Sequence, residues 1–144
     1  IKIKEITEAM TGALLDRPYI ENISDYIDQL EKVTVGKSAP YFSLPNEKGE
    51  KLSRSAERFR NRYLLLNFWA SWCGPCQMLL PVIEELSNEV TDAKICKINV
   101  DEESSLAEKY GVMSIPTLVV VKDGKTVSTS VGVQPKDKIL EMLK

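Results

Sequence analysis

The sequence contains no histidine and only three cysteines among its 144 residues. A structural zinc site takes four ligands, and cysteine and histidine supply most of them. Apart from the pair Cys73 and Cys76, only Cys96 is left. The chain therefore lacks the second ligand pair that a zinc centre within one chain needs. The residues present require no flavin or nucleotide either, so we predict no metal and no cofactor.

A large net charge and a long apolar run are also absent. The formal net charge of −2 gives no reason to expect nucleic acid or an acidic membrane as a partner. No apolar run reaches the roughly 20 residues that span a bilayer. The chain begins at Ile1 rather than Met. We therefore expect a trimmed fragment, in which a signal peptide, a lipid anchor or an upstream domain was lost with the missing part.

Cys73 and Cys76 lie at a predicted junction between a strand and a helix. Residues 63–69 are predicted to form a buried strand because they are apolar on both faces. From 77 to 90 the apolar positions recur with helical spacing. The unpaired N–H groups of a first helical turn favour a thiolate, so we expect a Cys73 pKa of roughly 3.5–7.5. Cys76, one turn further in, is expected to be more shielded.

Gly74 and Pro75 set the spacing between the two sulfurs. Proline is well tolerated in a first helical turn, where its missing N–H costs nothing. A purely structural disulfide is the competing interpretation. A loop this short removes little entropy from the unfolded chain, so stapling is a weak reason for the pair. The pattern favours a redox-active dithiol.

The segment 67–76, Asn-Phe-Trp-Ala-Ser-Trp-Cys-Gly-Pro-Cys, resembles the active-site segment of the thioredoxin family. The resemblance runs from about Tyr63 to Lys144 and includes further family-like positions in the same order: Pro81, 97–101, 110–112, 115–117, 122–125 and 131–132. It implies a thioredoxin-like three-layer α/β/α sandwich with a mixed central sheet. It also implies that Cys73 and Cys76 are the catalytic pair of a thiol–disulfide oxidoreductase.

The apolar pattern and the turn residues predict the order of elements within this stretch. Strands are expected at 63–69, 94–100, 117–122 and 126–131, and helices at 74–90, 103–110 and 135–143. The first two strands should be parallel, because a helix connects them. Asp123-Gly124 predicts a hairpin turn between the last two strands. The sheet is therefore expected to be mixed, with helices on both faces.

The resemblance assigns further residues to the surroundings of the cysteines. It implies a cis bond between Ile115 and Pro116, in a loop whose backbone pairs with an extended substrate. An ordinary turn proline at the start of a strand is the alternative. Trp72, Gly74 and Pro75 join this loop as predicted substrate-binding residues. Trp72 either contacts the partner or shields Cys73 without touching it.

Trp69, Asn67 and Lys97 are predicted to support the site. Trp69 should pack beneath the active-site loop. Asn67 stands where cytoplasmic thioredoxins carry a buried aspartate used in proton transfer, and an amide cannot titrate. Lys97 loses that partner, so we expect it to extend to solvent rather than to stay buried with a depressed pKa. Cys96 is expected to be buried and inert, a third redox-active thiol being the alternative.

Residues 1–36 are predicted to form a helical extension in front of a domain at 37–144. Apolar positions with near-helical spacing predict helices near 3–16 and 19–33, separated at Arg17-Pro18. Two interpretations stay open for this extension. It is either a structural appendage without chemistry or a regulatory or dimerising arm.

The lead-in segment 39–53 is predicted to be two short strands joined by a polar turn. It resembles the corresponding segment of extracytoplasmic thioredoxin-like proteins of the TlpA and ResA type, and peroxiredoxins share a related one. The resemblance implies a periplasmic or otherwise extracytoplasmic bacterial location, with a cytoplasmic location as the alternative.

The predicted function is thiol–disulfide exchange through Cys73 and Cys76, in the direction that reduces disulfides of protein partners. An unidentified electron donor would then have to regenerate the dithiol. Two alternatives belong to other classes. The first is a non-catalytic binding or chaperone module, because fold alone does not fix function. The second is a thiol peroxidase of the peroxiredoxin kind, although Leu66 and Ala70 stand where that family has proline and threonine.

Overall fold

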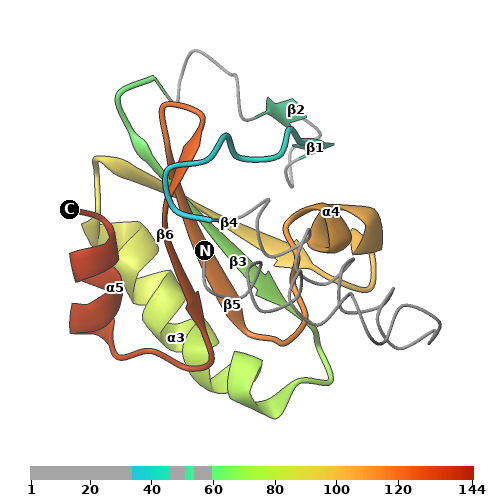
Figure 1. The fold of residues 1–144 in the computed structure, drawn as a ribbon. Coiled ribbons are helices and arrows are strands. Elements are labelled where there is room, and N and C mark those ends of the chain that lie inside the picture. Colours follow the sequence, from blue (N-terminus) through green and yellow to red (C-terminus); the bar gives the residue numbers. More distant parts are fainter. Residues whose placement is uncertain (1–33, 46–50, 54–59) are drawn as a thin grey trace, which may run out of the picture.

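The computed structural model describes residues 34–45, 51–53 and 60–144, in which a four-stranded sheet forms the centre (Figure 1). Its strands, in the order β4-β3-β5-β6, are β4 (Ala93–Asn99), β3 (Tyr63–Trp69), β5 (Thr117–Lys122) and β6 (Lys125–Val131). β3 and β4 are parallel, whereas β5 runs antiparallel to both β3 and β6. The predicted mixed sheet is therefore confirmed.

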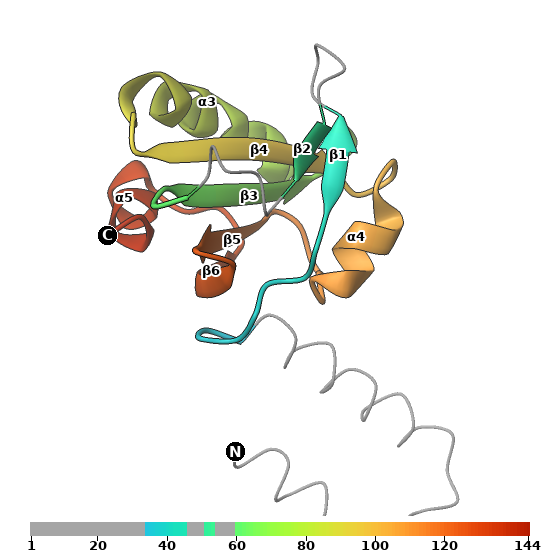
Figure 2. The same ribbon diagram turned by 90° about the horizontal axis from the view of Figure 1, so that it is seen from above.

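Helices cover both faces of the sheet (Figures 1 and 2). α3 (Gly74–Glu89) and α5 (Lys136–Met142) pack on one face, and α4 (Ser104–Lys109) packs on the other. The expected three-layer α/β/α sandwich is thus observed, and the predicted ends of its helices and strands differ from the observed ones by at most one residue. None of the helices in the described ranges is long and apolar enough to cross a membrane.

β3 and β5 lie at the centre of the sheet because their sequences can be buried on both faces. The inner residues of β3 and the first five of β5 are all buried. Alternate residues face opposite sides of a strand, so the two strands supply two cores. Leu64, Leu66 and Phe68 pack toward α4, and Leu65 packs toward α3 and α5.

The turn between β5 and β6 is the predicted two-residue hairpin. Asp123 and Gly124 have φ angles of 50° and 77°. Positive φ at both central residues is what a type I′ turn requires, and its twist matches that of the flanking strands. The Asp-Gly sequence therefore accounts for the pairing of Lys122 with Lys125 beside the turn, and the register shifts by one residue between Val120 and Val121.

Residues 36–39 form a strap that pairs with the start of β6. The N–H of Gly36 donates to the carbonyl of Thr126 at 2.8 Å, and the N–H of Thr126 donates to the carbonyl of Lys37 at 3.0 Å. Ala39 and Phe42 continue the strap into the core on the α4 side. The predicted boundary between residues 36 and 37 lies inside this paired segment, and the division into two parts stays a prediction.

Two short strands follow the strap, as expected for the lead-in segment. β1 (Ser43–Pro45) and β2 (Lys51–Ser53) pair antiparallel as a separate two-stranded sheet. The hydroxyl of Tyr110, at the end of α4, donates to the carbonyl of Pro40 at 2.9 Å and ties the strap to that helix. The helices predicted at 3–16 and 19–33 lie outside the described residues.

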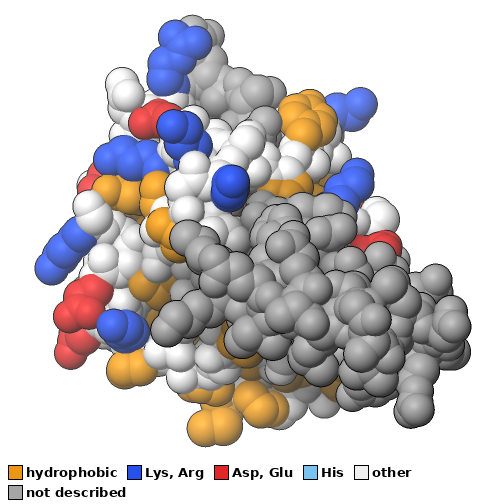
Figure 3. Space-filling view, in the orientation of Figure 1, with side chains coloured by type: hydrophobic (Ala, Val, Ile, Leu, Met, Phe, Trp, Pro, Cys, Tyr) orange, Lys and Arg blue, Asp and Glu red, His pale blue; other side chains and the backbone are white. Residues whose placement is uncertain are grey.

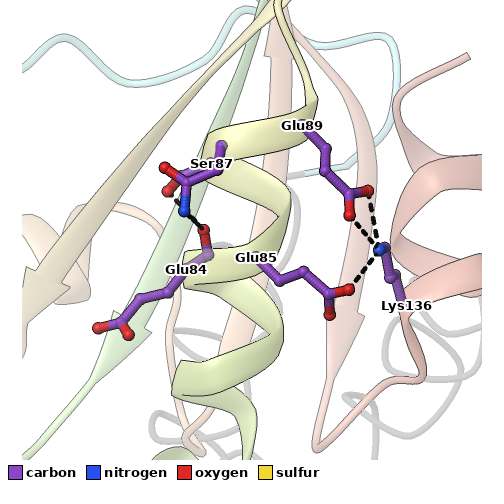
Figure 4. A network of polar contacts seen from close by, with 6 residues as sticks. Glu84, Glu85, Ser87, Glu89 and Lys136 are labelled. Carbon is purple, nitrogen blue, oxygen red and sulfur yellow. Dashed lines mark hydrogen bonds and ion pairs between the residues drawn. The ribbon is translucent and has the colours of Figure 1, made fainter.

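α3 and α5 are joined by an ion-pair cluster. Lys136 Nζ lies 2.8 Å from carboxylate oxygens of both Glu85 and Glu89, and Figure 4 shows the ammonium group between the two acids. Hydrogen bonds to the Glu85 and Glu89 carboxylates raise the pKa of Lys136 above its ordinary value. Exposed pairs contribute little free energy. The buried contacts of Ile83 and Leu86 with Ile139 and Met142 are therefore the main packing between α3 and α5.

Replacing Thr126 by valine should stabilise the fold. The Thr126 side chain is fully buried, and its hydroxyl has no hydrogen-bond partner among the described residues. Valine keeps the branched shape and removes the unsatisfied group, so we expect a gain of about 0.5–1.5 kcal/mol in the free energy of unfolding, measured by urea denaturation. Thr129→Val, at an exposed position of the same strand, is the matched control and should change little. A loss of stability in Thr126→Val would contradict the assignment.

Candidate functional site

Cys73 is the N-cap of helix α3 and directly precedes its first residue, Gly74. Its backbone is extended, and its Sγ accepts a hydrogen bond at 3.2 Å from the backbone N–H of Cys76. A disulfide joins Cys73 to Cys76. Pro75 lies in the first turn, at a position where a helix does not need its N–H. Cys76 is 1% exposed and Cys73 is 5% exposed, so the second cysteine is the better shielded of the two, as predicted.

The loop before β5 lies against the disulfide. The Ile115–Pro116 bond is cis, as the resemblance implied, and the carbonyl oxygen of Ile115 is 3.8 Å from Cys73 Sγ. The carbonyl of Pro116 accepts a hydrogen bond at 2.8 Å from the N–H of Gly132. The Thr117 hydroxyl donates to the Ser114 carbonyl at 2.6 Å. The loop is therefore held to β5 and to the end of β6.

Exposed apolar side chains come from the segments around the disulfide. Trp72 is 69% exposed, Met78 in α3 is 71% exposed and Met113 in the loop is 62% exposed. Figure 3 shows hydrophobic side chains gathered at the lower edge of the view, over the first turns of α3. A Cβ added to Gly74 would meet no atom within 4 Å. The sequence analysis did not predict that Met78 and Met113 belong to the site. Met78 follows Cys76 by two residues and Met113 precedes Ile115 by two, and this closeness in sequence is the only feature that could have indicated it.

The two tryptophans have different environments. Trp69 is partly buried and packs against Ala70 and the two cysteines, as predicted for a residue beneath the loop. Trp72 donates its indole Nε1–H to Asp101 Oδ2 at 2.9 Å. Asp101 follows β4 and was not among the predicted site residues. It is exposed and 29 positions away, so no sequence pattern signals this contact.

Asn67 lies in β3, between Lys97 of β4 and Leu118 of β5 in the strand register. Its side chain is 1% exposed, and neither amide atom has a hydrogen-bond partner among the described residues. The side chain of Lys97 is 42% exposed and its Nζ lies 3.8 Å from Glu84 of α3. Lys97 thus extends to solvent, as expected, and does not form a buried amine.

Cys96 is free and partly buried in β4. Burial raises the pKa of its thiol to about 11, and the nearby charge of Lys94 opposes this only in part. A thiol with so high a pKa is a poor nucleophile near neutral pH. This supports the interpretation of Cys96 as inert. In the described part of the chain, no group of three or more cysteine, aspartate or glutamate side chains is placed to hold a metal ion.

The family model and the relatives that match this chain are all thioredoxins. A family model described as Thioredoxin matches residues 50–144. A thioredoxin of Bacillus subtilis is 58% identical over 81 residues, which are 56% of this chain and 78% of that protein. A thioredoxin of Staphylococcus epidermidis is 55% identical over 80 residues, 55% of this chain and 77% of that protein.

Solved structures that are similar to this chain are also thioredoxins. A Fasciola hepatica thioredoxin matches with a TM-score of 0.57 and 35% identity, over 60% of this chain and 82% of its own. A mutant thioredoxin from Halobacterium salinarum matches with a TM-score of 0.54 and 49% identity, over 58% of this chain and 73% of its own.

Replacing Asn67 by aspartate should make stability depend on pH. Burial of the new carboxyl would raise its pKa above the usual value of about 3.9, so the folded state would bind the proton more tightly than the unfolded state. The variant should therefore resemble the wild type at pH 3 and lose stability as the pH rises from about 4, by roughly 1.4 kcal/mol for each unit of pKa shift. Urea denaturation at several pH values measures this difference.

Asn67→Leu is the control, because it cannot titrate and its difference from the wild type should not vary with pH. A pH-independent difference in Asn67→Asp would contradict the prediction. A gain of stability of Asn67→Asp with rising pH would also contradict the prediction. It would indicate that the Lys97 ammonium group lies beside the new carboxylate.

Cys96 should react slowly with alkylating reagents in the folded protein. With a pKa of about 11 instead of 9.0, its thiolate fraction at pH 8 is about 100-fold smaller than that of an ordinary thiol. Mass spectrometry after timed treatment with iodoacetamide measures the rate. The same measurement in urea supplies the reference, because the unfolded chain exposes the thiol. Equal rates in the two conditions would contradict the assignment.

Proposed function

Because this chain belongs to the thioredoxin family of thiol–disulfide oxidoreductases, we propose that it reduces disulfide bonds of protein partners through Cys73 and Cys76. The observation that carries the proposal is the position of Cys73 Sγ. It caps the N-terminus of α3, is bonded to Cys76, and lies beside a loop and an exposed apolar surface. The structure holds the oxidised form of the pair.

Reduction of a partner proceeds in two exchange steps. The Cys73 thiolate attacks one sulfur of the partner disulfide, forms a mixed disulfide and releases the other sulfur as a thiolate. Cys76 then loses its proton and attacks Cys73 Sγ, which breaks the mixed disulfide and releases the second partner sulfur as a thiolate. Two electrons pass to the partner, and the Cys73–Cys76 disulfide is formed. An electron donor, a dithiol or a reductase, must return two electrons for the next cycle.

The N-terminus of α3 favours the first step. The backbone N–H of Cys76 points at Cys73 Sγ at 3.2 Å, and the positive end of the helix dipole lies at the same atom. Both interactions stabilise a thiolate more than a thiol, so they lower the pKa of Cys73 in the reduced protein. Gly74 and Pro75 between the cysteines resemble the reducing members of the family, which supports the proposed direction.

The loop beside Cys73 is the proposed docking site for the backbone of the partner. An extended segment around the partner disulfide would pair with the backbone at Ile115, which precedes Pro116. Trp72, Gly74 and Pro75 would contact its side chains from the opposite side. The exposure of Trp72 and the open space above Gly74 support this arrangement.

The second step needs a route for the proton of Cys76. Asn67 cannot accept it because an amide does not titrate, and the Lys97 side chain extends toward Glu84 and solvent. We propose that the partner thiolate released in the first step takes this proton up, while the partner is still bonded to Cys73 through its other sulfur. Its pKa is close to that of an ordinary thiol, so the transfer costs little and the charges balance without a buried base.

The TlpA and ResA type of lead-in segment and the extracytoplasmic location stay predictions, made chiefly from the resemblance of residues 39–53. The matched relatives are thioredoxins aligned over 80 or 81 residues, and they lend this part of the prediction no support. The identity of the electron donor, a membrane anchor and the role of residues 1–36 likewise stay predictions.

Serine substitutions should separate the roles of the two cysteines. Cys73→Ser removes the attacking sulfur and should abolish reduction of insulin by dithiothreitol-driven turnover, to below about 1% of the wild-type rate. Cys76→Ser removes the resolving sulfur, so the mixed disulfide with a partner should accumulate and be visible on a non-reducing gel. Cys96→Ser is the matched control and should retain turnover.

Other outcomes would favour the alternatives. Retained turnover in Cys73→Ser would contradict the proposed catalytic role. Prevention of aggregation without disulfide reduction by the wild type would point to a binding or chaperone module. Rapid consumption of hydrogen peroxide, lost in Cys73→Ser, would point to a thiol peroxidase.

A further inference from the structure

Met78 extends the open face of α3 that begins at Gly74. Residues four apart lie on the same face of a helix, so Met78 stands one turn beyond Gly74. A Cβ added to Gly74 would meet no atom within 4 Å, and Met78 is 71% exposed. The buried side of the helix is formed by other residues, beginning with Cys76 and Leu79. The exposed thioether therefore lies on the face of α3 that starts next to Cys73.

Met113 lies in the second segment that flanks Cys73, the loop before β5. The carbonyl oxygen of Ile115 in this loop is 3.8 Å from Cys73 Sγ. The hydroxyl of Thr117 donates to the carbonyl of Ser114 at 2.6 Å, which holds the backbone next to Met113. The Met113 side chain is 62% exposed. Cys73 Sγ thus lies between two segments that each carry an exposed methionine.

Exposed thioethers react with hydrogen peroxide, and buried ones are shielded from it. The sulfur gives an electron pair to one oxygen of the peroxide, the O–O bond breaks, and the products are methionine sulfoxide and water. Met142, the other methionine in the described part of the chain, is 9% exposed and packs in the core that α3 and α5 share with the sheet. It supplies an internal reference for the reactivity of Met78 and Met113.

We propose that Met78 and Met113 are modification sites, at which oxidation by hydrogen peroxide slows the docking of protein partners. This role rests on the proposed function. A partner segment that reaches Cys73 Sγ covers the surface on both sides of it, and flexible thioethers adapt to segments of different shape. A sulfoxide is polar, and burying a polar group without a hydrogen bond costs free energy. A small disulfide that touches only the sulfur atoms covers neither methionine.

The experiment oxidises the disulfide form of the protein, in which Cys73 and Cys76 have no free thiol. Every sample carries Cys96→Ser, which removes the free cysteine, and Met10→Leu, because Met10 lies outside the described residues. After treatment with hydrogen peroxide and removal of the reagent, dithiothreitol reduces the disulfide. The rates of reaction with insulin and with oxidised glutathione are compared with those of the untreated protein. Peptide mass spectrometry measures the conversion of each methionine.

We expect Met78 and Met113 to be converted at least about tenfold faster than Met142, because oxidation follows exposure. Conversion of both should slow the reaction with insulin by about 3- to 10-fold and the reaction with glutathione by less than about 1.5-fold, because only the larger partner buries the sulfoxides. Methionine sulfoxide reductases for both epimers should restore the rate.

Two results would overturn the inference. The first is an unchanged rate with insulin after full conversion of Met78 and Met113. The second is an equal loss with insulin and with glutathione, since damage to the cysteines or to the fold would then explain the effect.

Leucine variants assign the effect to the two side chains, because leucine is apolar and cannot form a sulfoxide. In the double variant Met78→Leu/Met113→Leu, the treated and untreated samples should react with insulin at the same rate. Each single variant should lose part of the sensitivity to peroxide. Met142→Leu is the matched control and should remain as sensitive as the parent. A double variant as sensitive as the parent, or a single variant that is fully protected, would contradict the assignment of both residues.

The untreated samples separate this inference from the proposed function. An untreated protein that does not reduce insulin contradicts the proposed function. A protein that reduces insulin equally fast with and without the two sulfoxides retains the proposed function and overturns only the role of Met78 and Met113.

Discussion

The whole site depends on one interaction, the hydrogen bond from the Cys76 N–H to Cys73 Sγ at the first turn of α3. A helix leaves its first N–H groups without partners, and a side chain at the N-cap must satisfy them. Here the cap is Cys73 Sγ, the sulfur that we propose attacks the partner disulfide. Helix formation and thiolate stabilisation therefore use the same atoms, so the local fold of this segment and its reactivity change together.

Strand register brings the remaining parts of the site to that sulfur. Phe68 of β3 pairs with Thr117 of β5, so the loop that precedes β5 lies at the edge of the sheet where β3 ends. Trp69 pairs with Asn99 of β4, so the residues after β4 meet the same edge. A shift of one residue in either pairing would move side chains of β3 or β5 from one core to the other, and the packing of both cores opposes it. The packing of β3 thus defines the geometry around Cys73.

The elements near the centre could be predicted because their sequences allow few alternatives. β3 and β5 are apolar on both faces, and the Asp123-Gly124 turn permits one hairpin geometry. The cysteine pair and Pro116 were recognisable from spacing and family resemblance. Asp101 and Gln77 were not, because each is exposed and meets its partner only through tertiary structure. Polar surface residues have no periodic pattern in the sequence, so contacts between them can be identified only from the structure.

Asn67 places an uncharged amide in the buried part of β3. A carboxylate at this position would be a buried titrating group. The amide adds none, and Lys97 is drawn away to Glu84 at the surface. The chain contains no histidine, so neither an imidazole nor the amide at position 67 can act as a base in the exchange reaction. The pH dependence of exchange should therefore report the helix terminus and the dithiol, without a contribution from a buried acid.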